Sequence, residues 1–140
     1  MQRSIDIIDR NIVIINTWLK DISEEIGDID EEQAWGRLRA VLLTVRDRIE
    51  TDEAIHFGAQ LPIIVRGLFY EQWKPTETPR KWRHRDEYLE AVNSNIDGPD
   101  IDAELTVKAV LKVMDRHLEP GELKKVKEMH SKEVWDLWPE

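Results

Sequence analysis

Residues 34–49 read AWGRLRAVLLTVRDRI, and residues 103–118 read AELTVKAVLKVMDRHL. When Ala103 is aligned with Ala34, the second stretch repeats the apolar spacing of the first. The matching pairs are Ala34/Ala103, Leu38/Val107, Ala40/Ala109, Val41/Val110, Leu42/Leu111, Val45/Met114 and Ile49/Leu118. We interpret the match as an internal repeat, in which shared positions hold the fold and differing positions are where function was added.

Upstream of this stretch, an apolar stripe predicts a long first helix. Its members recur at steps of three and four residues: Ile5, Ile8, Ile12, Ile15, Leu19, Ile22 and Ile26. Gly27 follows directly and is typical of a helix end. Asp30 and Gln33 have the spacing of a capping box, which predicts that the second helix, with residues 34–49, begins there.

Two shorter helices are predicted to complete the first half of the chain. Thr51 is a candidate cap for the first of them, over 52–61. Pro62 restarts the chain for the second, over 62–73, unless the two segments form one kinked helix. The segment 75–79, Pro-Thr-Glu-Thr-Pro, is then the only convincing linker.

The second half repeats this order. Thr78 and Pro79 are predicted to open a helix with the apolar face Trp82, Leu89, Val92 and Ile96. A helix over about 101–118 follows, Pro120 opens the next one, and Ser131 caps a last short helix.

These patterns predict an all-α fold made of two tandem units of three to four helices, residues 1–76 and 77–140. Each unit has too few apolar stripes to bury its own surface. We therefore expect the units to pack around an approximate two-fold axis into one compact helical bundle.

Composition limits the classes of function. The chain has 140 residues, no cysteine and a net charge of −9, so disulfide or thiolate chemistry is excluded and nucleic acid is an unfavourable partner. No apolar stretch is long enough for a membrane span, and residues 1–10 lack the order of a signal peptide. We expect a cytoplasmic protein that does not bind membranes.

Several segments carry a family resemblance. They are TWL at 17–19, LRAVL at 38–42, RDRI at 46–49, EA at 53–54, AQLP at 59–62, RGLFYEQW at 66–73 and VWDLWP at 134–139. Together they are similar to the uncharacterised bacterial and archaeal family called domain of unknown function 2267. The resemblance implies a small helical cytoplasmic protein and brings no known activity, cofactor or catalytic residue. Gln72 departs from the family's usual Gly, and residues 129–131 depart from a second QLP.

Polar differences between the copies cluster in the first one and predict a binding face. Arg66, Tyr70 and Trp73 follow at steps of four and three, so they share one side of a helix, with Gln60 nearby. Arg offers a fork for a carboxylate or phosphate, and the aromatics offer flat contact area. In the alternative interpretation, Arg66 pairs with an acid and ties the two halves together.

A charge reversal at one repeat position predicts pairing between the copies. Arg46 and Asp47 align with Asp115 and Arg116. Across a two-fold axis, Arg46 would meet Asp115, or Asp47 would meet Arg116. Such pairs would fix register more than they would stabilise the fold.

Motifs for catalysis and metal binding are incomplete. Glu53 and His56 have the spacing of a di-iron helix motif, but the second copy lacks the matching pair, and the acidic segments fail the calcium-loop pattern. We predict no metal and no cofactor. The basic cluster at 80–85 is interpreted as a solvated helix start rather than an RNA contact.

The sequence therefore predicts a non-enzymatic interaction module that binds a protein partner or self-associates. The alternative is a small-molecule or anion-binding protein whose pocket lies between the repeats and is lined by Gln60, Arg66 and Tyr70. An enzyme with an unrecognised site is the third interpretation.

Overall fold

The computed structural model describes the backbone of residues 2–140 and the side chains of residues 6–140. Over this range the fold is all-α, as predicted, and contains no strand. Met1 and the side chain of Ile5, which the predicted unit and stripe include, lie outside the described residues.

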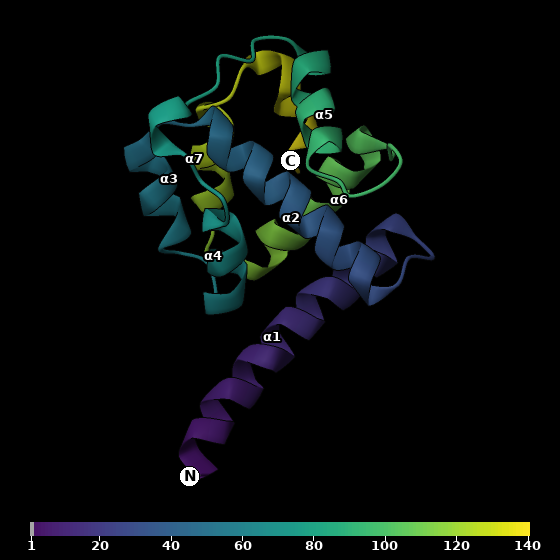
Figure 1. Ribbon diagram of the computed structural model, residues 1–140, viewed down its shortest axis with the longest axis vertical. Coiled ribbons are helices and arrows are strands. Elements are labelled where there is room, and N and C mark those ends of the chain that lie inside the picture. Colours follow the sequence, from purple (N-terminus) through teal and green to yellow (C-terminus); the bar gives the residue numbers. More distant parts are fainter. Residues whose placement is uncertain (1) are drawn as a thin grey trace.

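The helices surround α2, which packs against α1, α4, α5 and α6 (Figure 1). Their bounds are α1 Gln2–Ile26, α2 Glu31–Arg48, α3 Thr51–Gly58, α4 Ile63–Tyr70, α5 Arg85–Ser94, α6 Ala103–His117 and α7 Glu122–Glu128. Two 3₁₀ helices complete the chain, η1 at Pro75–Glu77 and η2 at Lys132–Leu137.

The turn between α1 and α2 forms as its residue types predict. Gly27 follows α1 with a φ of 94°, a left-handed conformation that suits glycine. Asp30 Oδ1 accepts a hydrogen bond from the Gln33 backbone N–H at 2.8 Å. Gln33 Oε1 accepts from the Asp30 backbone N–H at 3.0 Å. The predicted capping box is confirmed, and it fixes where α2 begins.

The prediction of a helix opening at Thr78 and Pro79 was wrong, because α5 begins only at Arg85. The segment before it binds the end of α2 with its backbone. The Arg80 N–H donates to the Asp47 carbonyl at 2.6 Å. The Trp82 carbonyl accepts from Arg48 Nε at 2.9 Å. Because the Arg80 N–H and the Trp82 carbonyl bind α2, they do not form the hydrogen bonds of an α-helix within their own segment.

The last two helices also differ in detail from the predictions. α7 begins at Glu122 rather than at Pro120, after Gly121 with a φ of 89°. Ser131 does cap the final helix, since its hydroxyl accepts from the Glu133 N–H at 3.3 Å. That final helix is 3₁₀ rather than α.

One apolar core draws on residues from both halves of the chain. Six of the seven pairs matched between 34–49 and 103–118 are buried at both positions: Ala34/Ala103, Leu38/Val107, Ala40/Ala109, Val41/Val110, Leu42/Leu111 and Val45/Met114. In the seventh pair Ile49 is buried and Leu118 is half-buried. Trp18, Tyr88 and Phe69 are the largest fully buried side chains. The two halves therefore share an interior.

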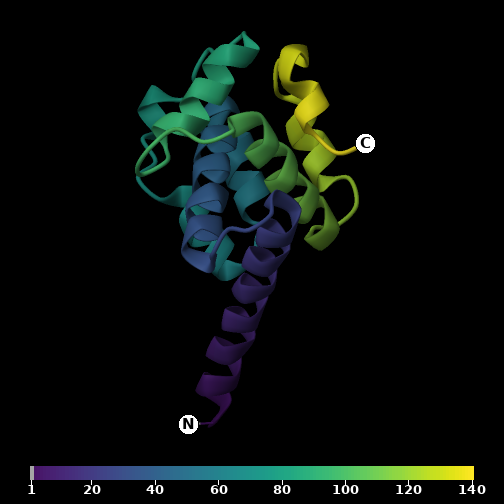
Figure 2. The ribbon, with the colours of Figure 1, turned by 90° about the vertical axis from the view of Figure 1, so that its right-hand side faces the viewer.

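The N-terminal part of α1 extends away from this body as a free helix (Figures 1 and 2). We call residues 2–14 the arm; its last residue, Ile14, is half-buried against the core, and Ile15 is the first buried residue among the described side chains of α1. In the part of the chain that the structure describes, no helix is both long enough and apolar enough to span a membrane.

Candidate functional site

The Arg66 side chain lies against the end of α3. Its Nε donates to the Gly58 carbonyl at 3.1 Å. Its Nη2 donates to the carbonyls of Ala59 at 3.3 Å and Leu61 at 3.0 Å. Carbonyls at a helix end have no partner within the helix, so this guanidinium satisfies them. Arg66 thus meets backbone oxygens, whereas the sequence predicted a ligand or an acid.

The other residues of the predicted face surround the same helix end. The Tyr70 hydroxyl donates to the Ile55 carbonyl at 3.1 Å, and its ring stacks on Trp73 with centroids 5.6 Å apart. Trp73 Nε1 donates to Thr78 Oγ1 at 3.3 Å. Gln60 lies exposed in the turn between α3 and α4. As the helical spacing predicted, the rings of Tyr70 and Trp73 lie together. The Tyr70 hydroxyl and Trp73 Nε1 both donate hydrogen bonds to groups of this chain.

The charged residues predicted to pair between the copies have other partners. Buried Arg46 contacts Asp47 Oδ1 at 2.8 Å and donates to the carbonyls of Phe69 at 3.1 Å and Glu71 at 2.6 Å. Arg116 pairs with Glu25 at 2.8 Å, while Asp115 is exposed. Arg46 therefore closes α2 onto the end of α4, and Arg116 joins α6 to α1, in place of pairing across the repeat.

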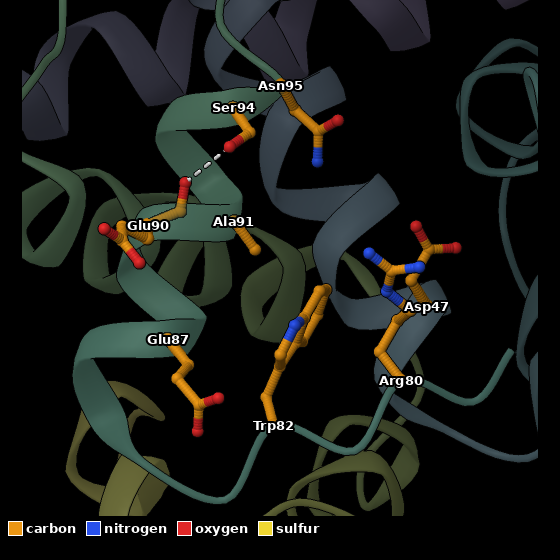
Figure 3. Close-up of a pocket in the computed structure, with 8 residues that line it drawn as sticks. All are labelled: Asp47, Arg80, Trp82, Glu87, Glu90, Ala91, Ser94 and Asn95. Atoms are coloured by element: carbon orange, nitrogen blue, oxygen red, sulfur yellow. Dashed lines mark hydrogen bonds between the residues drawn. The ribbon is translucent and has the colours of Figure 1, made fainter.

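A pocket of about 300 Å³ lies between α2 and α5 (Figure 3). Its lining residues are Asp47, Arg80, Trp82, Glu87, Glu90, Ala91, Ser94 and Asn95. Asp47, Glu87 and Glu90 bring three carboxylates against one guanidinium, so the pocket is a poor site for an anion. Glu87 already caps α5 by accepting from the Arg83 and His84 backbone N–H groups.

This pocket draws its lining from both halves of the chain, but Gln60, Arg66 and Tyr70, which the alternative interpretation placed in it, do not line it. Across the described part of the chain, no group of three or more His, Asp or Glu is placed to hold a metal ion. Neither feature points to a particular ligand.

A buried polar pair that the sequence did not predict joins α5 to the end of α7. The Tyr88 hydroxyl lies 3.0 Å from His130 Nε2, and His130 Nδ1 lies 2.8 Å from the Val126 carbonyl. A carbonyl only accepts, so Nδ1 carries the proton and Nε2 accepts from Tyr88. Burial lowers the pKa of His130 to about 4 and raises that of Tyr88 far above its ordinary range.

The C-terminal half of α1 is fixed to α6 by stacking and charge. Trp18 stacks on His117 with ring centroids 5.4 Å apart. His117 Nε2 lies 2.7 Å from Asp21 Oδ2. Hydrogen bonding from Arg116 lowers the pKa of Glu25, which Lys112 also contacts at 3.2 Å. These contacts hold α1 in one direction and so determine where the arm points.

The arm exposes apolar side chains that the body does not cover. Ile7, Ile8, Ile12 and Val13 remain 44–62 % exposed. They occupy different sides of the helix, because residues 7, 8 and 13 point in widely separated directions at 100° per residue. Large apolar side chains that gather exposed on one segment are a feature of interaction surfaces. The arm is therefore the strongest candidate for a functional surface of this molecule.

A groove of about 630 Å³ runs beside the base of the arm, between α1 and the start of α2. It is lined by Val13, Asn16, Thr17, Lys20, Ser23, Ile29, Asp30 and Glu31. Val13 and Ile29 form apolar parts of the groove wall. Lys20 places an exposed positive charge in the same groove. Arm and groove share Val13, so they form one continuous surface.

Sequence reasoning included the arm in a buried stripe and did not identify it as a surface. A signal was available in Ile7 and Val13, which lie off that stripe and remain exposed. Apolar residues outside a single face indicate that one neighbouring body cannot cover the whole segment.

Residues 15–137 match the profile of a family described as "Uncharacterized conserved protein (DUF2267)". The chain belongs to this family. The resemblance identified from the sequence is thus confirmed, and it covers nearly the whole body of the fold. No curated protein matches the chain. The matched residues begin at Ile15, where α1 becomes buried, so the arm of this family member lies outside the match.

Proposed function

We propose that this protein is a non-enzymatic interaction module that binds a protein chain through the arm of α1. The observation that carries the proposal is the exposure of Ile7, Ile8, Ile12 and Val13 on a helix that extends beyond the body. Exposed apolar side chains gathered on one segment are typical of protein–protein contacts. The side chains of the Arg66 face contribute less, since their polar atoms already contact the chain's own backbone.

The experiment is capture of bound proteins by the full chain from its native host. Ile8→Asp with Ile12→Asp places two charges on the arm, and Ile63→Asp places one on α4 at a residue that is also more than half exposed. The arm variant should lose the captured proteins, including untagged copies of the chain itself, and Ile63→Asp should retain them. Identical sets from wild type and both variants would contradict the proposal.

We infer further that the body consists of two related units, as the repeat predicted. The order of elements supports this, because α2, α3 and α4 are followed at corresponding positions by α6, α7 and η2. The helix ends at Arg48 and His117 also correspond in the alignment of the two copies. Both units lie in one core, which fits a duplicated scaffold on which only the first unit carries an arm.

A further inference from the structure

The arm is poorly suited to remain a free helix. It comprises residues 2–14 of the 25-residue α1, and most of its described side chains are exposed. Most helical stability in proteins comes from tertiary packing of an amphipathic face. Its described apolar residues are all Ile and Val, whose β-branched side chains are weaker helix formers than Leu or Ala. Packing against another surface is what would stabilise it.

The position of the body restricts how two arms can pack together. From Ile15 onward, α1 is buried against α2 and α6. Two arms side by side in the same direction would bring both bodies to the same end, where they compete for space. The arm leaves the body at one end (Figure 2). Two arms in opposite directions would therefore place the bodies at opposite ends of the pair.

Charge fixes the register of the antiparallel arrangement. Asp6, Val13 and Lys20 are spaced by seven residues, so they lie close to one line along α1. With a two-fold axis at Val13, Asp6 of each copy lies opposite Lys20 of the other. Asp6 and Lys20 are exposed, and within the described part of the chain neither has a partner at ion-pair distance.

The groove beside α1 provides the rest of the contact. In this register each arm runs along residues 13–24 of the other copy, which form one wall of its groove. Ile29 lies on the opposite wall and can cover an apolar side of the incoming arm that α1 alone would leave exposed. The overlapping helices extend over about 23 residues, or about 34 Å.

We propose that this protein forms a two-fold dimer in which each α1 arm lies antiparallel in the α1–α2 groove of a second copy, centred on Val13. The inference rests on the proposed function and names its partner. Asp6 and Asp9 of one copy face the Lys20 region of the other, and the exposed Val13 of each copy is covered at the axis.

The absence of cysteine from the chain allows a direct test of register. A full-length Val13→Cys variant places two thiols at the axis, where a Cα separation of about 5.5–6 Å permits a disulfide. An Ile7→Cys variant places its two thiols about 18 Å apart along the pair. Under mild oxidation Val13→Cys should form covalent dimer at least tenfold faster than Ile7→Cys. Equal rates would overturn the proposed arrangement.

Mass measurement by light scattering over a range of concentrations tests association itself. Wild type should have twice the 16.5 kDa mass of one chain, and Ile63→Asp should match it. Val13→Asp should be monomeric with unchanged helix content, because Val13 lies outside the core. Lys20→Asp should weaken association about tenfold, and Asp6→Lys in the same chain should restore it.

A wild type that stays monomeric at 100-fold above the concentration used for capture would overturn the dimer. If the arm variant still loses captured proteins of other kinds in that case, the proposed function stands with a different partner. If neither association nor capture depends on the arm, both proposals fail.

Discussion

Arg66 shows how a side chain with binding chemistry serves the chain's own backbone. Its guanidinium carries three hydrogen bonds to carbonyls between Gly58 and Leu61. Hydrogen bonds to charged groups contribute about 1.5–3 kcal/mol each to stability at most, and unpaired carbonyls are costly. A planar, multidentate donor is suited to a helix end followed by a tight turn, and Lys could not reproduce that geometry.

His130 is the residue through which acid should destabilise the fold. Its pKa in the folded state is about 4, against 6.5 for the free side chain. The unfolded chain therefore binds the proton first, so stability is full above pH 6.5 and falls as the pH drops towards 4. The loss from this one group approaches about 3 kcal/mol.

Urea unfolding followed by tryptophan fluorescence between pH 4 and 7 measures that loss. His130→Gln, which cannot titrate, should show a shallower decline in the free energy of unfolding, even if its stability at pH 7 is lower. His56→Gln changes an exposed histidine on α3 and should leave the wild-type slope intact. Parallel curves for wild type and His130→Gln would contradict the assignment.

Sequence patterns predicted which residues gather at these positions better than they predicted what those residues contact. The spacing of Tyr70 and Trp73 correctly placed their rings together, because helical periodicity fixes direction. The acceptors of Arg66 could not be predicted, since every residue has a carbonyl and only the fold decides which ones are left unpaired. The Tyr88–His130 pair depends on long-range packing and leaves no local signal.

At the scale of elements, α3 and α4 cross closely at Gly58. A Cβ added to Gly58 would overlap the Tyr70 hydroxyl and ring, which stacking on Trp73 holds in place. Inside a helix, Gly→Ala usually stabilises by about 0.5–1 kcal/mol. At Gly58 the overlap with Tyr70 should make the substitution destabilising instead.

We expect Gly58→Ala to lower the free energy of unfolding by about 1–3 kcal/mol. Gly36→Ala in α2, where no atom beyond the adjoining residues and the local helix backbone lies within 4 Å of the added methyl group, should raise it. Replacing Tyr70 by Ala should remove most of the cost of Gly58→Ala in a double-mutant cycle. A stabilising effect of Gly58→Ala in the wild-type background would show that the two helices are further apart.

The boundaries of helices were predictable where a local signal sets them and not elsewhere. Asp30 with Gln33 set the start of α2, and both residues are close in sequence. The start of α5 depends on bonds from Arg80 and Trp82 to α2, more than thirty residues away. A proline that would suit a helix start therefore does not begin one at Pro79.

At the scale of the whole molecule, the shared core makes the halves depend on each other. α1 packs on α6, and α2 packs on both α5 and α6. A fragment of residues 1–76 would expose those faces to water. We expect it to lack a cooperative urea transition, while the full chain unfolds in a single one. A fragment that unfolds cooperatively and stays monomeric would show that the first unit folds alone.

The shortness of α5 has a consequence for how large an assembly can grow. α5 is 10 residues long and the segment before it is tied to α2, so the second unit, over the residues described, has no extension like that of α1. A chain with two such extensions could recruit copies at both and elongate into fibres. In the proposed dimer the single extension of each copy fills its neighbour's recess, so growth should stop at two and concentrated solutions should remain clear.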